Sequence, residues 1–82
     1  MVFVLEGYIF ITSEPKKVWE IAEKALKIDG VKRAHTVTGQ FDIVAYAEFA
    51  NTDMLRRIIN DLQSLNGVLR TQTAVAIPPR LK

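Results

Sequence analysis

An internal repeat limits the folds that this sequence can adopt. Residues 28–33 and 65–70 each place an apolar residue, an Asp or Asn, a Gly and a Val in succession and end in Arg. A threonine follows each copy at the same offset, at Thr36 and Thr73. Each copy comes after a stretch with helical periodicity and opens a stretch typical of a strand. The repeat therefore predicts a strand–helix–strand unit that is present twice.

Length and composition set further limits. The chain has 82 residues, 49% of them hydrophobic and 24% charged, which is typical of one folded domain. It has no cysteine and one histidine, which excludes disulfides, thiol nucleophiles, cysteine metal sites and multi-histidine sites within one chain. We expect a core over residues 2–77 with a C-terminal tail at 78–82, no cofactor, and no contact with a membrane. The expected location is the cytoplasm.

Four strands are expected, at residues 2–11, 31–37, 41–49 and 68–77. The first is almost continuously apolar, which indicates a central strand. In the third strand, apolar residues and mostly polar residues alternate most regularly. One side of it carries Phe41, Ile43, Ala45, Ala47 and Phe49, and the other carries Asp42, Val44, Tyr46 and Glu48.

Two amphipathic helices connect these strands. Ser13, whose hydroxyl can cap a helix, and Pro15 mark the start of the first helix, and Gly30 marks its end. Asn51 or Thr52 is expected to cap the second. The apolar stripe of the first helix is Val18, Ile21, Ala22, Ala25 and Leu26, and that of the second is Leu55, Ile58, Ile59, Leu62 and Leu65.

Right-handed crossovers leave few ways to assemble this order of elements. The simplest is an α+β, ferredoxin-like βαββαβ sandwich, with a four-stranded antiparallel sheet in the order 4-1-3-2 and both helices on one face. The two most apolar strands, the first and the third, then become central. The more polar second and fourth strands become the edges.

The uncovered face of such a sheet is unusually apolar. Burying several hundred Å² of it is worth on the order of 10 kcal/mol gross, of which association entropy removes a large part. We therefore expect two copies to pack sheet to sheet as a homodimer; the alternative is that this face encloses a small ligand or cofactor. The outward residues are Val4, Glu6, Tyr8 and Phe10 on the first strand and Val44, Tyr46 and Glu48 on the third.

The turn at residues 37–42 is the segment most suggestive of binding chemistry. Gly39 permits a tight turn whose amides can face a small anion such as a carboxylate. Asp42 beside it offers an acceptor for an ammonium group. Donors next to an acceptor match a zwitterionic α-amino acid, although an ordinary hairpin carries the same residue types.

Catalytic and nucleic-acid patterns are missing from the sequence. No paired carboxylate motif, nucleophile pattern or Gly-rich phosphate loop occurs, so we do not expect an enzyme. His35 and Trp19 fit an exposed strand position and helix packing better than they fit catalysis. The basic residues form scattered pairs at a net charge of +2, which predicts no direct binding of nucleic acid.

Two segments at their relative spacing resemble a known family. Residues 37–46 and 67–73 are similar to the effector-binding domain, called the RAM domain, of the Lrp/AsnC feast/famine transcription regulators, and the resemblance covers residues 2–77. It implies a ferredoxin-like sandwich that dimerises through its sheets, associates further, for example as an octamer of four dimers, and binds amino acids between dimers. The ligand positions that it implies are Thr38, Gly39, Gln40, Asp42, Tyr46, Thr71 and Thr73.

The sequence departs from full-length members of that family because it begins with the first strand and has no helix-turn-helix segment. It is similar to stand-alone RAM proteins. We therefore expect an amino-acid-sensing module that modulates transcription by co-assembling with a DNA-binding relative. Two alternatives stay open. One is a dimeric αβ-barrel enzyme, such as a cofactor-free or haem-degrading monooxygenase, that uses a sheet-face cavity with His35 or Trp19. The other is an assembly adaptor without a ligand.

Overall fold

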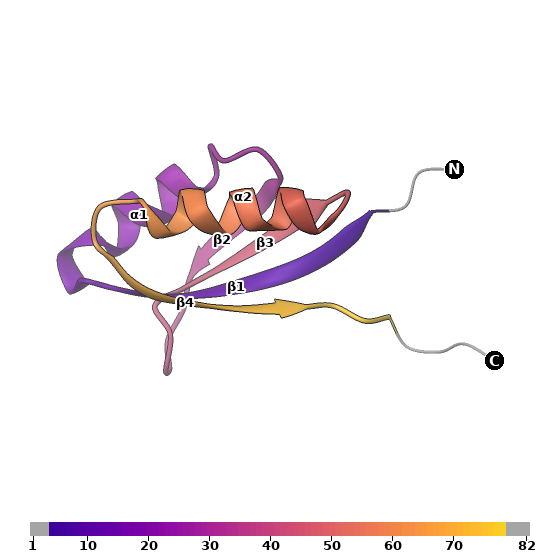
Figure 1. The fold of residues 1–82 in the computed structure, drawn as a ribbon. Helices are drawn as coiled ribbons and strands as arrows, with labels where there is room; N and C mark the ends of the chain where they lie inside the picture. Colours follow the sequence, from indigo (N-terminus) through magenta and orange to yellow (C-terminus); the bar gives the residue numbers. More distant parts are fainter. Residues whose placement is uncertain (1–3, 79–82) are drawn as a thin grey trace.

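A computed structural model describes residues 4–78 of the chain. Residues 2, 3 and 79–82, which belong to the expected core and tail, lie outside this part. The strands form one antiparallel sheet in the order β2-β3-β1-β4, and both helices cover the same face of it (Figure 1). The expected ferredoxin-like topology is confirmed. The elements are β1 (Leu5–Ser13), a 3-10 turn η1 (Pro15–Lys17), α1 (Val18–Ala25), β2 (Val31–Thr36), β3 (Ile43–Phe49), α2 (Thr52–Gln63) and β4 (Val68–Val75).

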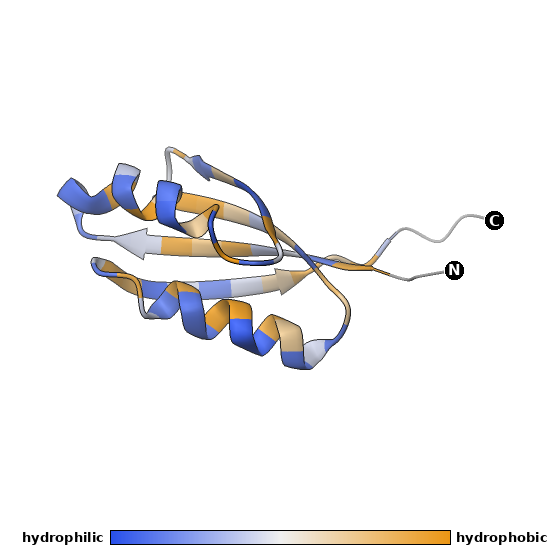
Figure 2. Cartoon of the chain, turned by 90° about the horizontal axis from the view of Figure 1, so that it is seen from above, coloured by the Kyte–Doolittle hydropathy of each residue, from blue (hydrophilic) through white to orange (hydrophobic). Residues whose placement is uncertain are grey.

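The core lies between the sheet and the two helices. Seen from above, α2 alternates hydrophobic and hydrophilic residues, as expected for a helix with one buried side (Figure 2). The alternation expected in β3 is confirmed from Ile43 onward, since Ile43, Ala45 and Ala47 are each fully buried. The buried hydrophobic residues are Ile9, Ile11, Ile21, Ala22, Ala25, Val31, Ile43, Ala45, Ala47, Phe49, Ile58 and Leu62.

The repeated glycine has a structural cause. Gly30, between α1 and β2, has a φ of +102°, and Gly67 takes the equivalent conformation between α2 and β4, at +99°. A β-carbon at Gly30 would lie 2.7 Å from the Cδ1 atom of Ile58, so this turn also packs directly against α2. A β-carbon at Gly67 would lie 2.7 Å from the Cβ atom of Lys17 in η1, so a positive φ and a close approach explain the glycine in both copies of the repeat.

The start of α1 differs from the expected one. Ser13 is the last residue of β1; its hydroxyl is buried and finds no hydrogen-bond partner among the described residues. The chain instead enters α1 through η1, whose N-cap Glu14 makes no side-chain capping bond. At the other end of α1, Leu26 is 48% exposed and does not belong to the buried stripe, because the helix ends at Ala25. Asn51 caps α2 as expected, with its Oδ1 accepting from the Met54 N–H at 2.9 Å.

Phe41 does not lie on the helix side of the sheet, as the alternation of residues 41–49 suggested. β3 begins only at Ile43, and residues 38–42 bend away from the strand direction, so the two-residue period does not extend back to Phe41. The Phe41 ring instead packs against Phe10, with centroids 5.1 Å apart. Phe10 pairs with Val44 on the face that the helices leave uncovered, which we call the open face.

Candidate functional site

The hairpin between β2 and β3 projects from the sheet on the side away from the helices (Figure 1). It is closed by the Val37 N–H, which donates to the carbonyl of Asp42 at 2.9 Å. Thr38, Gly39 and Gln40 are all exposed. Within the described part of the chain, none of their three amides donates to a backbone carbonyl. These three amides are therefore not used by the backbone hydrogen bonds of the hairpin.

Asp42 anchors the hairpin to β1. Its Oδ2 accepts from the backbone N–H of Ser13 at 2.9 Å, and its own N–H donates to the carbonyl of Ile11 at the same distance. These bonds lie at the irregularity in the β1–β4 register between Thr12 and Ser13. One carboxylate oxygen is therefore used by the fold itself. The other, Oδ1, has no hydrogen-bond partner among residues 4–78.

Thr71 and Thr73 lie on the helix side of the edge strand β4. The register pairs Thr71 with Ile11 and Thr73 with Ile9, both of which face the helices. The Thr71 hydroxyl accepts from the amide of Gln63 on α2 at 2.9 Å. Because Asp42 and Thr71 both contact β1 at Ile11, from opposite sides, they are about two strand spacings, or ~10 Å, apart. The structure brings these two residues to one end of the sheet.

Tyr46 belongs to a different place, near the middle of the open face. Its hydroxyl lies 2.6 Å from Glu6 Oε2 and 3.1 Å from Glu48 Oε2. The guanidinium of Arg33 lies over its ring at 4.7 Å from the centroid, and the ring of Tyr8 is 5.4 Å away, centroid to centroid. We call these five residues the Tyr46 cluster.

The Tyr46 cluster perturbs the acidity of its central group. The hydrogen bond to Glu6 raises the pKa of Tyr46 well above its ordinary value, with smaller contributions from desolvation and from Glu48. Strand alternation predicted that Glu6, Tyr46 and Glu48 lie on the open face, but it did not predict that they contact one another. Their contact depends on the pairing of Glu6 with Glu48 across β1 and β3, which alternation alone does not fix.

A shallow hollow of about 240 Å³ lies at the end of the sheet opposite the hairpin. Phe49 and Met54 contribute apolar lining, while Asp29, Lys32 and Glu48 contribute charges of both signs. No motif in the sequence marks this hollow. Its residues come from the segment before β1, the α1–β2 turn, β2, the end of β3 and the start of α2, which are distant in sequence.

The residues on which an enzymatic interpretation depends do not converge. His35 is exposed on β2 and pairs with Val44, whereas Trp19 is 72% exposed on α1, in the other layer. Neither of them lines the hollow. Among residues 4–78, no three His, Asp or Glu side chains are grouped as they would need to be to hold a metal ion. None of the helices in the same range is long and apolar enough to cross a membrane.

Comparison with known proteins identifies relatives along most of the chain. A family profile described as "Lrp/AsnC ligand binding domain" matches residues 6–79. The uncharacterised HTH-type transcriptional regulator PH1692 of Pyrococcus horikoshii is 33% identical over 73 residues, which are 89% of this chain and 49% of the regulator. The chain therefore spans about half the length of this curated relative.

Solved structures share the fold. The hypothetical protein PHS023 of Pyrococcus horikoshii is 26% identical with a TM-score of 0.82, and the match covers 94% of this chain and 93% of that one. The transcriptional regulator NMB0573 of Neisseria meningitidis, solved as a complex with L-Met, is 21% identical with a TM-score of 0.77, over 90% of this chain and 50% of that one. The second likeness concerns the fold alone.

Proposed function

Because this chain belongs to the Lrp/AsnC ligand-binding domain family, we propose that it is an amino-acid-sensing and oligomerisation module that acts on transcription. The match of the family profile to residues 6–79 carries this proposal. The curated relative is named as a transcriptional regulator, which supports a regulatory role and not an enzymatic one. In the proposal, contact with DNA is made by a co-assembled relative that carries a helix-turn-helix segment.

The proposed effector is an α-amino acid held beside the hairpin. The amides of residues 38–40 are suited to its carboxylate, and Asp42 Oδ1 is suited to its ammonium group. Thr71 lies at the same end of the sheet but on its helix side, and Tyr46 lies elsewhere on the open face, so residues 38–42 carry the proposed site. The complex of the Neisseria regulator with L-Met supports amino acids as the ligand class.

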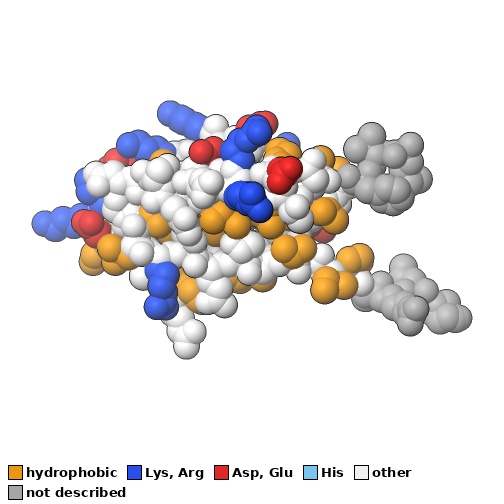
Figure 3. All heavy atoms as spheres, viewed as in Figure 1, with side chains coloured by type: hydrophobic (Ala, Val, Ile, Leu, Met, Phe, Trp, Pro, Cys, Tyr) orange, Lys and Arg blue, Asp and Glu red, His pale blue; other side chains and the backbone are white. Residues whose placement is uncertain are grey.

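The proposed assembly is a homodimer that buries the open face, with further association of dimers. Tyr8 is 42% exposed on this face, beside the half-buried Phe10 and Val44. In the space-filling view, which shows the sheet edge-on, hydrophobic side chains appear across the middle of the molecule and along its lower rim, away from the helices (Figure 3). Covering them provides the favourable free energy of association. The hairpin projects on the same side as this face but at one end of the sheet, and in the proposal it reaches past the covered rows to meet a neighbouring dimer, as in an octamer of four dimers.

The proposal is tested by a thermal-shift screen of the twenty amino acids. A real effector raises the midpoint in proportion to ln(1 + [L]/Kd). Asp42→Asn is the informative variant, because an amide oxygen still accepts from the Ser13 N–H while the negative charge is lost. We expect it to weaken effector binding about tenfold or more, the value of one charge-assisted hydrogen bond.

Asp61→Asn is the matched control, since Asp61 is exposed on α2 in the helix layer, whereas the hairpin projects away from that layer. It should bind the effector like the unmodified chain. If no amino acid moves the midpoint at millimolar concentration, the sensing function is wrong and the adaptor interpretation is favoured. If Asp42→Asn binds normally, sensing stands but the hairpin is not its site.

A further inference from the structure

The hollow at the end of the sheet opposite the hairpin has walls that are fixed by the backbone. The carbonyl of Gly30 accepts from the Glu48 N–H at 2.8 Å, which ties the α1–β2 turn to the end of β3. A β-carbon at Gly30 would lie 3.1 Å from the Cε atom of Met54, so the same turn also packs against the start of α2. Because three segments hold one another in place, the hollow is formed before any ligand arrives, which lowers the cost of binding.

Half of the residues that line the hollow are apolar. They are Phe49, which is only 2% exposed, the half-buried Met54, and Val4 and Ala50. The volume of about 240 Å³ is below the ~300–1,000 Å³ of pockets that hold drug-sized ligands. The hollow is therefore suited to a small metabolite with an apolar part of a few carbon atoms.

An irregularity in strand pairing brings Lys32 to this hollow. The register of β2 with β3 passes from the pair Val31–Ala47 to the pair Arg33–Tyr46, so the residue between them on β2 has no opposite partner. That residue is Lys32, and such a bulge redirects a side chain from the regular alternation of its strand. Val31 belongs to the core and Arg33 lies over the Tyr46 ring, whereas Lys32 lines the hollow.

Two carboxylates line the same hollow, those of Asp29 and Glu48. Neither forms an ion pair with Lys32, since the ion pairs within 4.0 Å across residues 4–78 all involve Glu20 on α1. Glu48 accepts from the Tyr46 hydroxyl through Oε2, and its Oε1 has no hydrogen-bond partner in the same range. The hollow thus presents charges of both signs, without salt bridges, next to an apolar surface.

Charged residues just outside the hollow leave both signs in place. On the open face, Glu6 accepts from the Tyr46 hydroxyl at 2.6 Å, and Arg33 lies over the Tyr46 ring. One of the two is acidic and the other basic, and neither lines the hollow. Asp53 precedes Met54 in the first turn of α2 and does not line it either. A ligand in the hollow therefore meets two carboxylates and one ammonium group.

We propose that the hollow binds a small zwitterion with an apolar tail, such as an aliphatic α-amino acid. Its ammonium group lies between Asp29 and Glu48, and its carboxylate group pairs with Lys32. Its tail covers Phe49 and Met54. A ligand with a single charge leaves one sign of the lining unmatched and binds less tightly. The site is separate from the proposed effector site at the hairpin, which lies at the other end of β3.

The test compares three probes that share one carbon chain. L-Norvaline carries both charges, n-butylamine is the same molecule without the carboxylate, and pentanoate is the same molecule without the ammonium group. Each is titrated into isotope-labelled chain that carries Asp42→Asn, so that the hairpin site is weakened, and amide resonances are followed by NMR. L-Norvaline should shift the amides of Gly30, Lys32 and Ala50 saturably. The other two probes should need about tenfold higher concentration or more, the value of one charge-assisted hydrogen bond.

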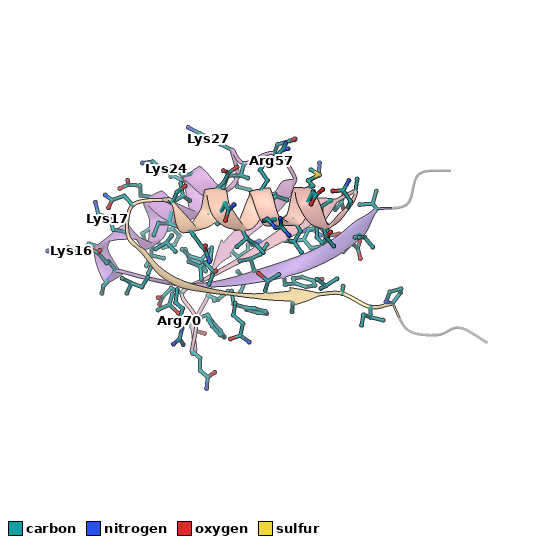
Figure 4. All side chains as sticks on the ribbon, viewed as in Figure 1. Lys16, Lys17, Lys24, Lys27, Arg57 and Arg70 are labelled. Atoms are coloured by element: carbon teal, nitrogen blue, oxygen red, sulfur yellow. The ribbon has the colours of Figure 1, made fainter. Side chains whose placement is uncertain are left out.

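Variants that remove one charge assign each contact. Lys32→Gln should bind n-butylamine as tightly as L-norvaline, and Glu48→Gln should narrow the preference for L-norvaline over pentanoate. A glutamine at position 48 still accepts from the Tyr46 hydroxyl. If Glu48→Gln is not folded by circular dichroism, Asp29→Asn in the exposed turn replaces it. Lys27→Gln is the matched control and should leave all three affinities unchanged, because Lys27 lies in the helix layer and does not line the hollow (Figure 4).

Two results overturn the proposal. One is the absence of saturable shifts at the amides of the hollow at high millimolar L-norvaline, and the other is equally tight binding of either single-charge probe by the Asp42→Asn chain. The same titration of the unmodified chain keeps the two sites apart. Shifts confined to residues 38–40 support the hairpin site and overturn the site in the hollow, whereas shifts confined to the hollow support it and count against the hairpin.

Discussion

At the scale of single residues, two side chains serve the fold and the proposed function at once. One carboxylate oxygen of Asp42 accepts a hydrogen bond from the Ser13 N–H, and the other, which makes no hydrogen bond among residues 4–78, is the one proposed to meet a ligand. Tyr46 bridges two strands through carboxylates that would otherwise repel each other. The sequence pointed to both Asp42 and Tyr46 as candidate ligand positions. Their hydrogen-bond partners depend on the register between strands, which the sequence does not reveal.

The Tyr46 hydroxyl should titrate at unusually high pH. Its ordinary pKa of 10.0 is raised because the neutral phenol donates to Glu6, and ionisation would place a third negative charge beside Glu6 and Glu48. The contribution of this hydrogen bond to the free energy of unfolding is present in full below the pKa of Tyr46 in the unfolded chain. It is lost as the pH rises through the higher pKa of Tyr46 in the folded chain. The stability of the fold should therefore fall as the pH rises above about 10.

Ultraviolet titration of phenolate formation measures this directly. The chain has two tyrosines, so subtracting the titration of Tyr46→Phe from that of the unmodified chain isolates Tyr46. The difference should show a midpoint above 10.0 while the chain is still folded. A midpoint at or below that value would contradict the bond to Glu6.

At the scale of elements, the sequence predicts the start of α2 better than the start of α1. Asn51 caps α2 through its own side chain, a local interaction that residue type predicts well. Ser13 has the same capping chemistry but is held in β1 by the pairing of that strand with β4 and by Asp42. At the start of α1, the strand pairing of Ser13 and its hydrogen bond with Asp42 therefore outweigh the preference of serine for a helix N-cap. Phe41 is a second case, since the bend at the hairpin interrupts the alternation of residues 41–49 and the Phe41 ring packs against Phe10.

Asn51→Ala should lower the free energy of unfolding by about 1 kcal/mol, because the Met54 N–H loses its acceptor at the start of α2. Urea denaturation at fixed protein concentration measures the change. Asn51→Asp keeps an acceptor at the same position and should be close to neutral. Asn60→Ala, in the exposed middle of the same helix, should be neutral or slightly stabilising. Equal losses from the two alanine variants would show that the cap contributes nothing.

At the scale of the whole molecule, the fold covers only one side of its sheet. Topology followed from the repeat, because two strand–helix–strand units with right-handed crossovers leave both helices on the same face. The same reasoning predicted which residues of β1 and β3 point away from the helices. It could not predict how charges are distributed along the open face, since Arg70 takes its place there through the pairing of β4 with β1.

If a second copy covers the open face, thermal stability must depend on protein concentration, because dissociation and unfolding are linked by mass action. We expect the midpoint of the unmodified chain to rise with concentration. Ala74→Asp should abolish that rise: Ala74 is exposed in the single chain and pairs with Tyr8 in the middle of the open face, so an aspartate there disturbs the monomer little but places a charge in the interface. Trp19→Lys removes an exposed aromatic side chain from the helix layer and should leave the concentration dependence unchanged. Calorimetry over a hundredfold range of concentration distinguishes the cases, and a concentration dependence that survives Ala74→Asp but disappears with Trp19→Lys would move the interface from the sheet to the helices.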